Sequence, residues 1–105
     1  RTKRRGFNRT RSENNGGIMS IKIKTTEAAA GTSSGTGSNV SSATCVRVFN
    51  SGTTVRLVTL EESGGTDIGT FSVAGGATVF LEKDPTDKIF AAHAEILLAA
   101  VALKG

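Results

Sequence analysis

The chain has 105 residues, of which 37% are hydrophobic, and it contains five phenylalanines but no tryptophan or tyrosine. This length leaves room for one domain, and so small a domain buries only about 60% of the surface that its unfolded chain exposes. A single copy should therefore be marginally stable. We expect contacts with further copies, in a homo-oligomer, or with a larger partner to add to the buried surface.

The positive charge is concentrated at the N-terminus, although the formal net charge of the whole chain is only +4. Residues 1–18 contain one acid, Glu13, and six cations, whereas the remainder is close to neutral. The six cations are Arg1, Lys3, Arg4, Arg5, Arg9 and Arg11. A basic segment ahead of a near-neutral body is typical of an arm that docks on an acidic partner, either nucleic acid or an anionic protein surface.

Residues 1–18 have no hydrophobic period, so we predict an extended basic arm there and a single domain over residues 19–105. An alternative is that the natural protein begins at Met19 and that the preceding residues are a translated leader. No apolar segment follows the basic residues, and the longest apolar run, Ile96 to Leu103, is much shorter than the roughly 20 residues of a membrane-spanning helix. The sequence predicts no signal peptide and no membrane partner.

The centre of the chain, residues 44–83, consists of short apolar runs separated by turn-forming residues. Valine, threonine, phenylalanine and isoleucine dominate the runs, and these side chains suit the half-buried surface of a sheet. Glycine and asparagine between the runs tolerate the positive φ of tight turns. The spacing predicts a β-meander with strands at residues 44–49, 55–60, 68–73 and 77–83.

The segments on either side of the meander complete the predicted sheet. Residues 19–25 alternate between apolar and polar side chains, which predicts an edge strand with lysines on its wet face. Residues 27–43 are rich in glycine, serine and threonine and predict a long loop. A turn at Asp84–Asp87 should precede another strand at residues 88–92.

Residues 94–104 are ambiguous, because alanine and leucine are strong helix formers and Glu95 before an apolar run suits a helix start. Both alternating faces of this segment are apolar, as in a strand buried on both sides, so we prefer a closing strand to a short helix. The elements together predict an all-β fold, a small antiparallel β-sandwich or barrel with an extended N-terminal arm. Phe71 and Phe80 should lie in its core on facing strands.

The inventory of reactive side chains predicts that the protein is not an enzyme. His93 is the single histidine, so no histidine metal cluster or histidine-relayed triad can be assembled, and with Glu95 it should share a strand face or bracket a turn. The single cysteine, Cys45, excludes an internal disulfide and should be buried with a raised thiol pKa. Acids in predicted turns, where we expect solvated side chains, are Glu61, Glu62, Asp67, Asp84 and Asp87. We therefore expect no catalytic residue, no metal site and no cofactor.

Sequence-specific recognition of nucleic acid has little support in the sequence. Tyrosine and tryptophan are absent, and the phenylalanines fall mostly at strand positions, so few side chains are available to stack on bases. Only the arm could bind nucleic acid, through its phosphates. We expect no specific nucleic-acid partner.

Three blocks of the body carry a recognisable pattern: Val46 to Ser51, Ile68 to Phe71 with Gly75-Gly76, and Val79 to Ile89. They combine an asparagine-containing first turn, at Asn50, with a late Lys-x-Pro-Thr-Asp turn at Lys83 to Asp87. With these two turns, the body of the chain, residues 19–105, resembles small β-sandwich virion proteins of tailed bacteriophages. The resemblance implies a virion component, often a capsid decoration or cement protein, and brings no catalytic residues. The long basic arm departs from the pattern of that group.

The resulting hypothesis is a capsid cement protein on the outer surface of the virion. Its sandwich would cluster with its own copies, and its arm would clamp neighbouring subunits of the major capsid protein. The arm cations Arg1, Lys3, Arg4, Arg5, Arg9 and Arg11 would then make the partner contacts, through charge-assisted hydrogen bonds. Two alternatives stay open. One is a neck, tail or fibre component of the phage, and the other is a non-viral module that uses the arm on nucleic acid or a loop face on carbohydrate.

Overall fold

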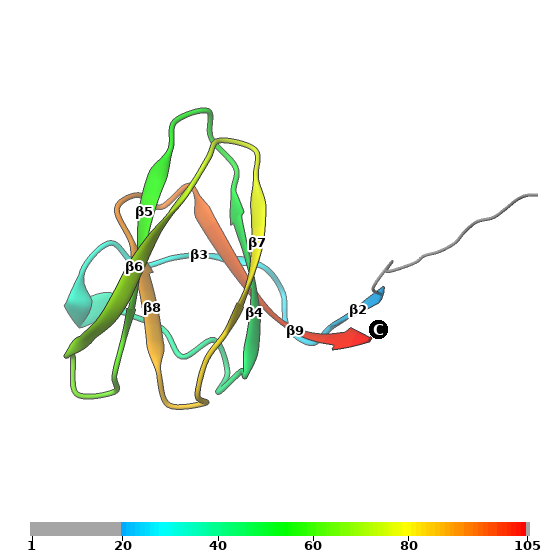
Figure 1. Ribbon diagram of the computed structural model, residues 1–105, viewed down its shortest axis with the longest axis horizontal. Coiled ribbons are helices and arrows are strands. Elements are labelled where there is room, and N and C mark those ends of the chain that lie inside the picture. Colours follow the sequence, from blue (N-terminus) through cyan, green and yellow to red (C-terminus); the bar gives the residue numbers. More distant parts are fainter. Residues whose placement is uncertain (1–19, 105) are drawn as a thin grey trace, which may run out of the picture.

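The computed structural model describes residues 20–104, which form β-strands and one short 3₁₀ helix (Figure 1). The strands are β2 (Ser20–Ile23), β3 (Ala28–Ala29), β4 (Cys45–Asn50), β5 (Arg56–Glu61), β6 (Asp67–Val73), β7 (Thr78–Glu82), β8 (Lys88–Ala91) and β9 (Ile96–Lys104), and the helix is η3 (Ser34–Thr36). The basic arm of residues 1–18 and Met19, where we place the start of the domain, lie outside the described residues.

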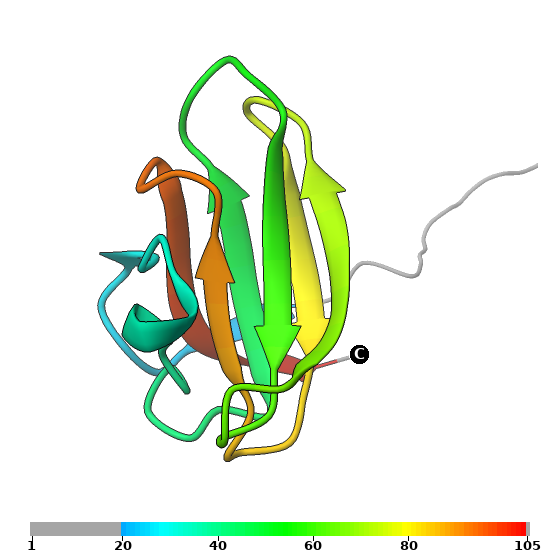
Figure 2. The same cartoon turned by 90° about the vertical axis from the view of Figure 1, so that its left-hand side faces the viewer.

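The strands form two antiparallel sheets, one behind the other in Figure 2. The first sheet has the order β2-β9-β4-β7, with β3 also paired to β9, and the second has the order β6-β5-β8. Aliphatic side chains of both sheets share one core, including Val46 and Val48 of β4, Val58 of β5 and Ile89 of β8. The predicted all-β fold with antiparallel sheets is confirmed, and its two layers give it the form of a sandwich.

The connectivity is not the meander predicted for residues 44–83. Of the successive strands in that range, only β5 and β6 pair with each other. Strand β4 pairs with β7 and β9, and β5 also pairs with β8, so the chain changes sheet after β4, β6, β7 and β8. Alternation along a strand marks its buried face but does not say which sheet it joins, and successive strands are neighbours only in about two-thirds of cases. The prediction was wrong on this point.

A buried asparagine holds the crossing from β4 to β5. Asn50 is fully buried, and its Nδ2 donates hydrogen bonds to the carbonyl oxygens of Thr54 (2.7 Å) and Val73 (2.9 Å). Its Oδ1 accepts a hydrogen bond from the backbone N–H of Gly52 (2.9 Å). One side chain thus satisfies backbone groups of the turn and of the end of β6, which offsets the cost of burying an amide.

The C-terminal segment forms the long strand β9, so the prediction of a strand rather than a helix is confirmed. Residues 96–100 pair with β4 on one side, while β3 and β2 pair along the other side. Leu98 and Ala100 belong to the core, and Ala99 and Val101, on the opposite face, are also buried. Residues 98–101 are therefore buried on both faces of the strand.

The loop predicted over residues 27–43 is tied to both sheets. Ala28–Ala29 form β3, and isolated bridges join Gly31 to Phe90 and Ser38 to Ile89 at the edge of β8. We name residues 30–43 the strap, because they close the side of the sandwich between β9 and β8. On the opposite side, β6 and β7 are edge strands of their sheets within the described part of the chain.

Phe71 packs against the core from β6, whereas Phe80 does not lie in the core. In β7 the inward side chains are those of Val79 and Leu81, which pair with core residues of β4. Phe80 lies on the outward face with Glu82 and is 41% exposed, so its predicted core position was wrong. The polar residue two positions along the strand already marked that face as the wet one, because strand side chains alternate between two faces.

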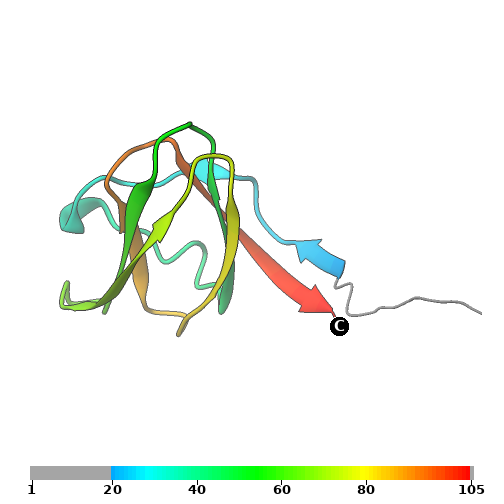
Figure 3. The same cartoon turned by 45° about the horizontal axis from the view of Figure 1, so that its top comes forward.

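The end of β9 leaves the sandwich together with β2 as a two-stranded ribbon (Figure 3). Strand β4 follows β9 only as far as Ala100, whereas β2 pairs with residues 101–104. We call β2 with residues 101–104 the ribbon. The predicted edge position of β2 and the exposure of Lys22 are confirmed, but the apolar face of β2 is poorly covered, since Ile23 is 69% exposed.

Alanine substitutions of the two phenylalanines test this register. Phe71→Ala removes a ring that packs on the core and should lower the free energy of unfolding by an amount near the lower end of about 3–5 kcal/mol. Phe80→Ala should change it by less than about 1 kcal/mol, because the ring lies on the surface. Urea unfolding of both variants measures the two values. Equal large losses would show that β7 has the opposite register.

Candidate functional site

The histidine and its neighbouring acid have structural partners. His93 lies in the turn between β8 and β9, and its Nδ1 accepts a hydrogen bond from the backbone N–H of Glu95 (3.1 Å). The Glu95 carboxylate pairs with Nε of Arg56 at 2.6 Å. His93 and Glu95 therefore bracket a turn, which was one of the two predicted arrangements. Within residues 20–104, no three metal-ligating side chains gather in a way that could hold an ion.

Cys45 occupies the position predicted for it. It is a free, buried cysteine at the start of β4. Burial raises the pKa of its thiol, the negative charge of Glu82 opposite it on β7 raises the pKa further, and a backbone hydrogen bond from Val46 lowers it in part. The thiolate that a nucleophilic cysteine needs is thus disfavoured.

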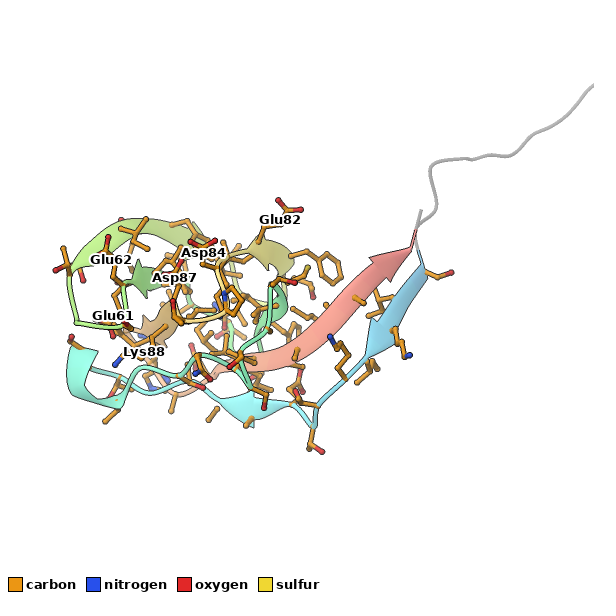
Figure 4. The ribbon with its side chains drawn as sticks, turned by 90° about the horizontal axis from the view of Figure 1, so that it is seen from below. Glu61, Glu62, Glu82, Asp84, Asp87 and Lys88 are labelled. Carbon is orange, nitrogen blue, oxygen red and sulfur yellow. The ribbon has the colours of Figure 1, made fainter. Side chains whose placement is uncertain are left out.

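An open cleft of about 820 Å³ is lined by residues of β5, β6 and β7, of the β7–β8 turn and of the base of the ribbon. Figure 4 shows this end of the sandwich from below. Its apolar lining consists of Leu60, Ile68, Val101 and Ala102, and Cys45 lies beside them. Its polar lining consists of Lys24, Thr44, Glu82, Lys83, Asp84 and Asp87. We call this hollow the acidic cleft, and it is the first of two candidate binding surfaces.

A β-bulge shapes the apolar part of the acidic cleft. The register of β5 and β6 shifts between Leu60 and Glu61, and Ile68 is left without a partner in the ladder. A bulge redirects side chains at a sheet edge. Ile68 is 51% exposed and lines the cleft together with Leu60. The cleft therefore presents apolar surface next to an unpaired strand edge.

The predicted Asp84–Asp87 turn is present at the rim of the acidic cleft, and Lys83 holds it from the buried side. Nζ of Lys83 donates hydrogen bonds to the carbonyl oxygens of Asp84 (3.1 Å) and Pro85 (3.5 Å). Burial lowers the pKa of Lys83, and the nearby carboxylates of Asp87 and Asp84 oppose that shift. The Asp87 carboxylate accepts a hydrogen bond from the backbone N–H of Asp84 (3.2 Å), so the turn is fixed internally.

Carboxylates gather at this end of the molecule, and Figure 4 shows most of them. The acids are Glu61, Glu62, Asp67, Glu82, Asp84 and Asp87, and the lysines nearest to them in the fold are Lys24, Lys83 and Lys88. The ion pairs that the two arginines of residues 20–104 form lie elsewhere, between Arg47 and Glu27 and between Arg56 and Glu95. The acidic end is therefore negative on balance.

Glu61 corrects the prediction that all turn acids are solvated. It ends β5 and is completely buried under the strap. Its Oε1 accepts a hydrogen bond from Oγ of Ser34 (2.7 Å), while Oε2 has no hydrogen-bond partner. Glycine at position 37 leaves room for this carboxylate, since a Cβ there would lie 2.5 Å from Oε2. No local pattern signals the burial, because the covering residues come from a distant part of the chain.

The second candidate surface is the outward face of the first sheet. The guanidinium carbon of Arg47 lies 5.1 Å from the centroid of the Phe49 ring, and Nη1 of Arg47 pairs with the Glu27 carboxylate at 2.7 Å. Phe80 is opposite Arg47 in the ladder, and the exposed Ile23 extends this face onto the ribbon. We call Phe49, Phe80 and Ile23, with the Arg47–Glu27 pair between them, the apolar face.

Neither surface was predicted from the sequence, because each is assembled from several strands and no motif marks it. The arm residues predicted as partner contacts, Arg1, Lys3, Arg4, Arg5, Arg9 and Arg11, lie outside the described residues. No helix within residues 20–104 is long and apolar enough to cross a membrane. Compared with known proteins, the chain matches no family model, no curated protein and no solved structure.

Substitutions at Glu61 and Ser34 test how the strap is held. Ser34→Ala removes the hydrogen bond to the buried carboxylate and should cost about 1–3 kcal/mol of stability. Glu61→Gln keeps an acceptor for Ser34 and removes a buried charge, so its stability should equal or exceed that of the original chain. Urea midpoints of the two variants measure the difference. A glutamine variant much less stable than the alanine variant would show that the buried charge itself is needed.

Proposed function

We propose that the chain is a structural protein of a bacteriophage virion, a capsid decoration or cement protein that binds neighbouring subunits of the major capsid protein. It acts by adhesion, as a small sandwich seated on the outer surface of the shell. The observation that carries the proposal is the apolar face, in which Phe80 on the first sheet and Ile23 on the ribbon are exposed on the outward side.

The exposure of this face indicates a partner. Ile23 is 69% exposed and Phe80 is 41% exposed, and both lie on the outward face of the same sheet. Two-stranded ribbons are at best marginally stable alone in water, and contiguous exposed apolar surface marks interaction sites. A protein surface laid over the ribbon would bury Ile23 and hold β2 against β9.

The scale of the face favours a repeating partner. Only a few large side chains contribute to it, so one contact should be weak. Attachment to a lattice makes each later contact intramolecular and multiplies weak affinities. The basic arm directly precedes the outer end of the ribbon, at Ser20, so the arm and the exposed Ile23 of the ribbon would engage neighbouring subunits together.

A charge placed on the ribbon tests the apolar face. Ile23→Glu should reduce binding to empty shells of the phage's own coat protein by about tenfold or more, because a carboxylate would be buried at the contact. The fold should tolerate the change, since the side chain is mostly exposed. Cosedimentation with shells at constant coat concentration gives the affinity.

Leu57→Glu is the matched control for this experiment. Leu57 is also an exposed apolar strand residue (46%), but it lies on β5 of the second sheet. Its variant should bind shells like the original chain. If both variants bind normally, the apolar face is not the attachment surface. If both lose binding equally, the contact depends on overall charge rather than on the apolar face.

Deleting residues 1–17 tests the arm. The truncated chain should occupy fewer sites on the shell at about 0.15 M salt, where exposed charges farther apart than about 8 Å are largely screened. The full chain should bind DNA only weakly and without sequence preference, because six cations without base-reading groups offer little beyond counterion release. Unchanged shell occupancy would remove the arm from the attachment. Tight binding to a defined DNA sequence at this salt would overturn the cement proposal.

A further inference from the structure

We propose that the acidic cleft of one copy binds residues 3–11 of a second copy, so that the basic arm links copies of this chain to one another. The inference concerns the chain alone and does not rest on its attachment to a capsid. The acidic cleft combines an apolar floor, a negative rim and two strand edges without a partner strand in the described residues.

The cleft has exposed apolar surface that an apolar side chain of a ligand would cover. Ile68, redirected by the bulge, is 51% exposed and lies with Leu60 on the floor. Strands β6 and β7 are the edges of their sheets at this side, so their outer backbone groups are available within the described residues. Extended peptides bind such edges by adding a strand, with alternate side chains directed into pockets.

The negative charge at the rim of the cleft favours a basic ligand. Glu82 and Asp84 are exposed lining residues, and Glu62 and Asp67 add exposed negative charge at the same end of the sandwich. Of the two lysines in the lining, Lys83 already donates to carbonyl oxygens of the rim turn. A ligand with several cations around one apolar group would complement both the rim and the floor.

Residues 3–11 have this composition in the required order. An extended segment places alternate residues on one face, and the odd positions are Lys3, Arg5, Phe7, Arg9 and Arg11. Phe7 is the only aromatic residue of the arm, and cations stand two positions before and after it. With Phe7 on Leu60 and Ile68, Arg5 and Arg9 would reach opposite parts of the acidic rim. The even positions contribute the single cation Arg4.

The place where the arm joins the fold suits a contact with a neighbouring copy. The arm joins the fold at Ser20, which pairs with Lys104 at the outer end of the ribbon. The ribbon points away from the two sheets (Figure 3), so the point where the arm joins the fold is set off from the sandwich. The twelve residues between Phe7 and Ser20 can span about 40 Å when extended, which is well beyond the length of the four residue pairs of the ribbon.

Charge reversal on the two sides of the contact tests the proposal in the full-length chain. Arg5→Glu with Arg9→Glu reverses the arm, and Glu82→Lys with Asp84→Lys reverses the rim at exposed positions. Each double variant alone should lose concentration-dependent self-association in sedimentation velocity. An equimolar mixture of the two should associate again, because each arm then meets a rim of opposite charge. An arm that folded back on its own cleft would not be rescued by mixing.

Two further variants test whether self-association depends on Phe7 and on the charges that line the cleft. Phe7→Ala should weaken self-association by about tenfold or more, from the loss of one buried aromatic side chain. Glu62→Lys with Asp67→Lys removes the same charge from the same end without changing the cleft lining, and it should weaken association much less than reversal of the rim. Equal losses from both reversals, a mixture that stays monomeric, or an original chain that is monomeric up to about 100 μM in low salt would each overturn the proposal. All measurements omit coat protein, so they stand apart from the proposed attachment to capsids.

Discussion

The structure depends on the pairing of β9, which serves two environments along its nine residues. Its first part lies between β4 and β3, with Leu98 and Ala100 in the core, and its last part pairs with β2 outside the sandwich. Small side chains at Ala99 and Ala100 let both faces be covered closely. If β9 were released, the first sheet would lose the strand that joins β4 to β2 and β3. The ribbon and the core are therefore parts of one cooperative unit.

This arrangement connects binding to stability. The ribbon leads directly into the strand that completes the core, so a partner that covers Ile23 also favours the paired state of β9. Ligands that bind only the native state raise the free energy of unfolding by mass action, and a small domain has little stability to begin with. The free protein should thus be the weakest form of the chain. A contact on the ribbon would then stabilise the fold as well as the proposed assembly.

The sequence predicts the strands of this structure better than their pairing or the surfaces that several strands form together. The alternation in residues 44–83 and the doubly apolar segment 94–104 gave the strands, because side-chain period and burial are local properties. Strand partners depend on which sheet buries a face, which is not a local property, and the predicted meander was wrong for this reason. The buried position of Glu61 and the two candidate surfaces arise where distant segments meet. Phe80 differs, because the polar neighbours on its face did carry the necessary information.

The positions of the two surfaces affect which assemblies the chain could form. The acidic cleft adjoins the apolar face, because Glu82 of the cleft lies on the same outward face of β7 as Phe80, and Val101 of the cleft pairs with Ile23. An arm that enters a neighbour's cleft can be reciprocated within a pair, close into a ring or continue as an open chain. A contact that is mainly electrostatic weakens at physiological salt, which limits open chains in solution. On a lattice, the spacing of attached copies would instead decide which cleft each arm reaches, and weak contacts would then add up through their high effective concentration.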